Sequence, residues 1–172
     1  MSADPCFRRP GARPLASLGL DATEVGALAV LRHFMTSFAQ PESQAWTHAF
    51  DIACERWGIA EGPRLAQGLL AVLRAVMACR QTGLTFSNPL CQECRLRVTA
   101  DEAAMMTMLH HMRRDATVDA RLALADLTFG RMDARLIQAA LALAARFPAE
   151  RDGFGGQPDV AEWAEGTPQR LH

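Results

Sequence analysis

Apolar residues recur every three or four positions through most of the chain between residues 21 and 148. This period is typical of amphipathic helices, whose apolar stripe faces a core. Capping, glycine and proline signals divide the pattern into six stretches. The predicted helices cover about 21–38, 41–57, 64–80, 99–114, 117–129 and 133–147. The expected fold is therefore all-α, a single helical bundle of about six helices.

Two of the predicted helix starts carry the capping-box pattern. Asp21-Ala-Thr-Glu24 opens the first helix, and Thr99-Ala-Asp-Glu102 opens the fourth. In a capping box the first side chain accepts a hydrogen bond from the third helical amide, and the glutamate accepts one from the backbone N–H of the cap. Gly58 is predicted to end the second helix, because glycine is favoured just after the last helical turn.

The apolar stripe of each helix also predicts which side chains fill the core. His33 falls roughly opposite the stripe of the first helix, so we expect it to be solvated. The predicted core positions on the first, second, fifth and sixth helices are Leu28, Leu31, Phe34, Met35 and Phe38; Trp46, Phe50, Ala53 and Trp57; Val118, Leu122, Ala125 and Phe129; and Leu136, Ile137, Ala140, Leu141, Leu143, Ala144 and Phe147.

The length of 172 residues and the apolar content of 49% favour one domain with one sizeable core. Residues 1–20 are rich in proline, arginine and glycine and are expected to form a mobile arm. The helical domain is expected to cover residues 21–148, and residues 149–172 are expected to be a disordered tail. Alternatively, the tail segment 159–165 is amphipathic and its Trp163 docks on the body or on a partner.

The charge balance gives little support to a nucleic-acid partner. The chain has 18 basic and 19 acidic side chains and a net charge of −1, so it lacks the basic field that drives non-specific binding to nucleic acids. The best local candidate for a basic patch consists of Arg95, Arg97, Arg113 and Arg114. Its simplest interpretation is a solvated surface.

No apolar run in the sequence reaches the roughly 18 to 20 residues that a membrane-spanning helix needs. The first residues also lack the apolar centre of a signal peptide. We therefore expect a cytoplasmic protein without a membrane partner. Five cysteines in a reducing compartment indicate metal binding or simple burial in preference to a set of disulfides.

The chemically distinctive residues gather between positions 79 and 111. Cys91-Gln-Glu-Cys94 has the spacing that lets two thiolates bind one ion at about 2.3 Å. Cys79, twelve positions earlier, and either His111 or His110 on the next predicted helix complete a shell of three thiolates and one imidazole. The predicted zinc ion would staple the loop 81–98, which is long for a link between two helices and needs a reason to be ordered.

Three other interpretations of the cysteines stay open. Cys54, Cys79, Cys91 and Cys94 supply the four thiolates of an iron–sulfur cluster, provided that the second helix brings Cys54 to the loop. A redox pair without metal is another interpretation, although the strand and helix that flank such pairs in thioredoxin-like proteins are missing. The last is that the cysteines are incidental.

The sequence lacks the common catalytic signatures, including the phosphate-binding Gly-x-x-x-x-Gly-Lys, the Gly-x-Ser-x-Gly nucleophile motif and His-Glu-x-x-His. The best functional prediction is a non-enzymatic regulatory or adaptor protein that presents the metal-ordered loop to a protein partner. The alternative is an iron–sulfur or thiol redox sensor. The sequence leaves the oligomeric state open.

Overall fold

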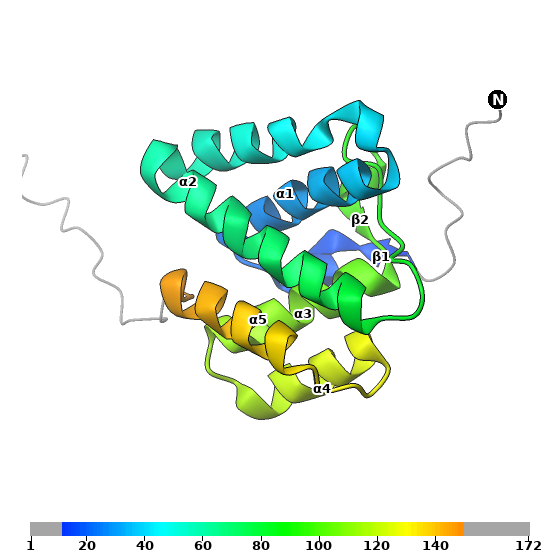
Figure 1. Ribbon diagram of the computed structural model, residues 1–172, viewed down its shortest axis with the longest axis vertical. Helices are drawn as coiled ribbons and strands as arrows, with labels where there is room; N and C mark the ends of the chain where they lie inside the picture. The colour runs from blue at the N-terminus through cyan, green and yellow to red at the C-terminus, as the bar shows by residue number, and fades with distance from the viewer. Residues whose placement is uncertain (1–11, 150–172) are drawn as a thin grey trace, which may run out of the picture.

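The computed structural model describes residues 12–149 of the chain. The predictions made for residues 1–11 and 150–172 lie outside this range. The described chain is mostly helical, as predicted, and its helices are α1 Ala22–Ala39, α2 Ala45–Cys79, α3 Ala100–Arg113, α4 Thr117–Thr128 and α5 Ala134–Arg146 (Figure 1). Three short 3-10 helices, Leu15–Leu18, Pro41–Ser43 and Cys94–Leu96, and two strands, β1 Arg13–Pro14 and β2 Arg97–Val98, complete it.

The helices form two packed groups that share one core. In the first group α1 packs along α2, and in the second α3 packs along α4. The last helix, α5, joins the groups because it contacts both α2 and α3 (Figure 1). The loop 81–98 runs from the end of α2 to β2, beside α1 and the start of α3.

The described residues contain five helices, not six, because the second and third predicted helices are two halves of α2. Gly58 interrupts the helical backbone with φ 76° and ψ 168°, so α2 changes direction there (Figure 1). Beside this kink the two halves come close to each other. A Cβ atom built on Gly62 would lie 2.4 Å from the carbonyl oxygen of Ala53, so only glycine fits this approach.

Both capping boxes are present. The Asp21 side chain accepts from the Glu24 amide at 2.8 Å, and Glu24 accepts from the Asp21 amide at 2.9 Å. The same reciprocal pair joins Thr99 and Glu102 at the start of α3. Asp133 caps α5, also as the sequence predicts.

Residues 12–20, which the composition placed in a mobile arm, are ordered against the loop. Strand β1 pairs antiparallel with β2, with Arg13 opposite Val98 and Pro14 opposite Arg97. The Arg97 guanidinium also donates to the carbonyl oxygen of Ala12 at 2.6 Å. A proline-rich stretch can pair in this way because proline is tolerated on an edge strand.

Several predicted core faces are wrong. His33 is buried, whereas Phe38 and Trp46 are exposed. On α4 the whole predicted stripe is misplaced, since Leu122 is 62% exposed and the face that packs on α3 is the neighbouring one. The buried side chains of α4 are Ala120, Ala123, Leu124, Leu127 and Thr128. Alanines let two helices approach closely, and a stripe chosen by the size of its apolar residues overlooks them.

Within residues 12–149, none of the helices is long and apolar enough to span a membrane.

Candidate functional site

The loop 81–98 is held by a buried ion pair that the sequence analysis did not predict. Nε of Arg32 on α1 lies 2.7 Å from one oxygen of Glu102 on α3, and its Nη2 lies 3.1 Å from the other. Both side chains are almost completely buried. Such a pair is sustained only where hydrogen bonds satisfy its remaining donors and acceptors.

The loop backbone supplies those hydrogen bonds. The amides of Ser87 and Thr99 donate to Glu102 at 2.9 and 2.8 Å, and the Ser87 hydroxyl lies 3.2 Å from it. On the other side, the Arg32 guanidinium donates to the carbonyl oxygens of Arg95 and Arg97 at 3.1 and 2.5 Å. One charge pair therefore fixes both arms of the loop to α1 and α3.

A second ion pair fixes the start of the loop. Nη2 of Arg80 lies 2.8 Å from Asp101, whose other oxygen accepts from both the amide and the hydroxyl of Thr85 at 2.7 Å. Burial raises the pKa of Asp101, but the two Thr85 hydrogen bonds and the charge of Arg80 outweigh it and hold the pKa below its usual value. Arg80 also stacks on the ring of Phe129 and donates to the carbonyl oxygen of Leu127.

Two cavities flank the fixed loop where it meets the end of α1. They have volumes of about 320 and 360 Å³, and both are lined by Ala39 and Phe86. Phe38 and Met77 line the first and are exposed, and Leu90, which lines the second, is 81% exposed. We call this surface, defined by Phe38, Met77, Phe86 and Leu90, the loop face.

Two histidines lie in the second cavity of the loop face. The rings of His33 on α1 and His48 on α2 have centroids 5.8 Å apart. Burial of His33, together with the charge of His48, lowers the pKa of His33. The neutral imidazole of His33 is therefore favoured there.

A separate network of ion pairs joins the start of α1 to the end of α3. The Glu24 carboxylate contacts Nδ1 of His110 at 2.9 Å, Arg113 at 2.7 Å and Arg114 at 2.5 Å. Asp21 contacts the same two arginines. Burial raises the pKa of Glu24, but hydrogen bonds from His110, the Asp21 amide and Arg114 hold it below its usual value.

The predicted zinc ligands are spread over this framework. The Cys94 amide donates to Sγ of Cys91 at 3.3 Å, so the Cys-x-x-Cys turn is formed. Cys79 is buried in the last turn of α2, where its thiol donates to the carbonyl oxygen of Val76 at 3.3 Å. His110 is engaged by Glu24, and the His111 ring stands edge-on to His110.

Among residues 12–149, no three His, Cys, Asp or Glu side chains lie together in an arrangement that could hold a metal ion. Burial and the nearby carboxylate of Asp133 raise the pKa of the Cys79 thiol, against the weaker opposing effects of its own backbone hydrogen bond and of two arginines. The protonated thiol is the form that these neighbours favour. The zinc site and its iron–sulfur alternative therefore stay predictions from the sequence.

The predicted basic patch is divided by the structure. Arg113 and Arg114 are neutralised by Asp21 and Glu24, and Arg97 donates to the carbonyl oxygen of Ala12. Arg95 is exposed. The four arginines therefore do not act together on an anion.

The sequence contained one overlooked signal for the buried pair. Arg32 stands between Leu31 and His33, inside the most regular apolar stretch of α1, where a charged side chain needs a buried partner. Glu102 was recognised only as a capping residue. No local pattern indicates that the two meet, because they are 70 positions apart.

Comparison of the chain with protein-family models, with curated proteins and with solved structures gave no match.

Proposed function

We propose that the chain is a non-enzymatic regulatory or adaptor protein, and that the loop face binds a protein partner. The observation that carries the proposal is the pair of cavities on either side of Phe86, bordered by the exposed side chains of Phe38, Met77 and Leu90. Exposed apolar side chains gathered around hollows are typical of interaction surfaces.

The Arg32–Glu102 pair supports this proposal because it makes the surface rigid. Ser87 and Thr99 are hydrogen bonded to Glu102, so the loop keeps its shape without a partner. A preorganised surface loses less conformational entropy when it binds. Leu90 is then exposed at a fixed position, as an anchor residue at an interface would be.

The chemistry of the loop face favours a partner with apolar anchors. The first cavity is lined by Met35, Leu84 and Phe86 and by a few polar side chains. More than half of the residues that line the second are polar, and Phe86 and Leu90 are its large apolar ones. Two apolar side chains of the partner, spaced to enter both cavities, would bury this surface. Nucleic acid is a poorer fit, because Arg113 and Arg114 are already paired with carboxylates.

Site-specific photocrosslinking in cells of the source organism tests the proposal. A photoreactive residue at Leu90 is expected to yield a discrete crosslinked complex with another protein. The matched control is the same residue at Ile59, which is more exposed than Leu90 but lies at the kink of α2. Equal crosslinking at both positions, or none at Leu90, would contradict the proposal.

Zinc binding would add a further restraint on the same loop. It stays a prediction, and elemental analysis of zinc and iron per chain in freshly purified protein tests it independently of the partner.

A further inference from the structure

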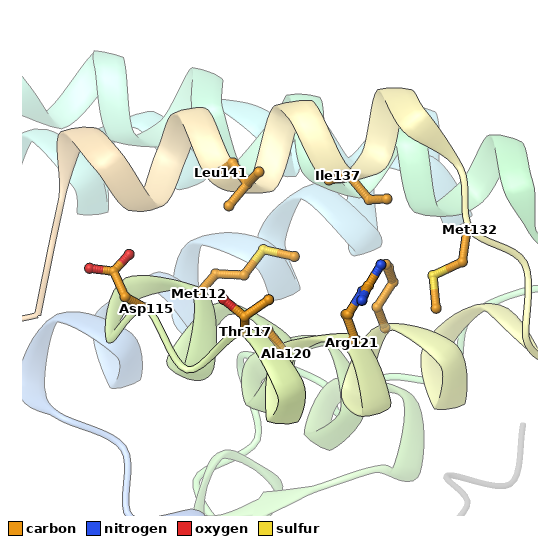
Figure 2. A pocket seen from close by; sticks show the side chains of 9 residues that line it. Met112, Asp115, Thr117, Ala120, Arg121, Met132, Ile137 and Leu141 are labelled. Atoms are coloured by element: carbon orange, nitrogen blue, oxygen red, sulfur yellow. The ribbon is translucent and has the colours of Figure 1, made fainter.

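Another hollow, lined mainly by apolar side chains, lies between α3, α4 and α5, away from the loop face. Its volume is about 250 Å³. Figure 2 shows Ile137 and Leu141 on the α5 side, Arg121 on the α4 side and Met112 between the two helices. We call this hollow the α4/α5 groove.

The apolar rim of the α4/α5 groove is open to solvent. Leu141 is 51% exposed and Met132 is 54% exposed, although both line the groove. The sequence analysis predicted Leu141 as a core residue. In the structure the apolar stripe of α5 extends to the surface at this position, and residues 12–149 leave about half of the Leu141 side chain uncovered. An apolar surface of this kind calls for an occupant.

The structure fixes the start of the C-terminal segment at one end of this groove. The Arg113 guanidinium donates to the carbonyl oxygens of Phe147 and Pro148, at 2.7 and 3.3 Å. The Ala149 amide donates to the Arg113 carbonyl oxygen at 3.2 Å. Arg113 directly follows Met112, which lines the groove. Ala149, the last described residue, therefore lies beside the groove.

We propose that residues 159–165 of the same chain dock in the α4/α5 groove, with Trp163 as the anchor. Val160 and Trp163 are three positions apart, so a helical turn would present both on one face. That pair matches the groove's apolar lining between Leu141 and Met132.

The length of the connection suits this occupant. Ten positions separate Ala149 from Asp159, and three of the intervening residues are glycines. A glycine-rich chain of that length has a root-mean-square end-to-end distance of about 17 Å. A helix of 13 residues such as α5 is about 20 Å long. The effective concentration of a tethered segment is highest when the linker length matches the distance to be spanned. A linker of about 17 Å reaches along most of the α5 side of the groove.

The charge of Arg121 supports the same assignment, and Figure 2 shows Asp115, the other charged residue of the lining, apart from it. Arg121 on the groove wall is exposed and forms no ion pair or hydrogen bond with another side chain of residues 12–149. The segment carries three carboxylates, at Asp159, Glu162 and Glu165. Glu162 directly precedes Trp163, so it is placed to reach Arg121 when the indole is in the groove.

Methyl NMR of methionine-labelled, full-length protein tests the proposal. The ring current of a docked indole shifts nearby methyl resonances, so the Met112 and Met132 signals are expected to move when Trp163→Ala is introduced. Met77, on the loop face, is the internal control and should not move. Identical Met112 and Met132 signals in both proteins would overturn the proposal.

A charge-reversal pair makes the test specific. Arg121→Glu is expected to move the Met132 signal toward its position in Trp163→Ala, and the double variant Arg121→Glu/Glu162→Arg should restore it. Docking within one chain is also independent of concentration. Signals that shift on dilution of the wild-type protein would show that the segment of a second copy fills the groove, and would overturn the intrachain proposal.

Discussion

Glu102 accepts a hydrogen bond from Nε of Arg32 at 2.7 Å, and both side chains are sealed from solvent. Glu102 is at the same time the third helical residue of a capping box and the acceptor of the Ser87 amide. One carboxylate therefore starts α3, neutralises a buried arginine and holds the loop 81–98. These contacts are by themselves a physical reason for the loop 81–98 to be ordered.

Glu102→Gln should destabilise the protein strongly. It leaves the Arg32 guanidinium buried without a counter-charge, which costs about 3 to 5 kcal/mol of the free energy of unfolding. Urea denaturation measures the loss. The control is Glu61→Gln, which breaks exposed pairs with Arg64 and Arg146 and is expected to leave stability nearly unchanged.

The double variant Arg32→Met/Glu102→Leu separates charge from packing. Replacing both members of a buried pair by apolar groups of similar volume is often neutral. Here it should recover only the part of the loss that comes from the unpaired charge, because the backbone groups of Ser87, Thr99 and Arg97 also lose their partners. A Glu102→Gln protein as stable as the wild type would contradict the role given to this pair.

Acid should remove the contribution of Glu24. Because the folded pKa of Glu24 is below its usual value, the unfolded chain takes up the proton first as the pH falls. The stabilisation is complete above the usual glutamate pKa of about 4.3 and is lost as the pH falls through the lowered pKa. Glu24→Gln is then less stable by roughly 2 kcal/mol at pH 7, where hydrogen bonds to a charged group are lost.

Urea midpoints measured from pH 7 down to pH 3 check the sign. The difference between the wild type and Glu24→Gln should begin to shrink below the usual glutamate pKa of about 4.3 and should close as the pH falls through the lowered pKa of Glu24. A constant difference across the range would mean that the charge of Glu24 does not stabilise the fold.

Gly62→Ala tests the packing inside α2. The new Cβ would lie 2.4 Å from the backbone oxygen of Ala53, so the two halves of the helix must separate. Overpacking of this kind costs about 1 to 3 kcal/mol, which a thermal melt detects. Gly83→Ala is the matched control, since a Cβ there meets nothing within 4 Å. Equal melting temperatures for the two variants would argue against the close approach.

Thiol labelling distinguishes a buried Cys79 from a metal ligand. Because burial and Asp133 raise its pKa, Cys79 should react with iodoacetamide more slowly than the half-buried Cys54 in native protein. Mass spectrometry of the labelled peptides gives both rates. Equal rates would contradict this account, and acceleration of Cys79 labelling by a chelator would support the predicted zinc site instead.

The sequence predicts the local features of this fold well because they depend on neighbours in the chain. Both capping boxes, the cap at Asp133 and the stripe from Leu28 to Met35 on α1 are confirmed. Each rests on residues within one or two turns of each other. The break at Gly58 is also where it was predicted, although α2 continues beyond it.

Features that depend on distant residues could not be predicted. The face of α4 that packs on α3 contains small alanines such as Ala120 and Ala123. The sequence analysis placed the core on the stripe of larger apolar residues instead. The Arg32–Glu102 pair joins α1 to α3, and no local pattern records that contact. For the candidate site, the sequence identified the loop 81–98 but not the residues that fix it.

The most direct test of the account is the hydrogen-exchange rate of the Ser87 amide, measured by NMR in the wild type and in Glu102→Gln. The amide donates to Glu102 at 2.9 Å, so the account predicts slow exchange in the wild type. In Glu102→Gln it should exchange much faster, while amides in the middle of α5 keep their rates under native conditions. A Ser87 amide that exchanges at the rate of an unprotected loop in the wild type would contradict the claim that Glu102 holds the loop face in place.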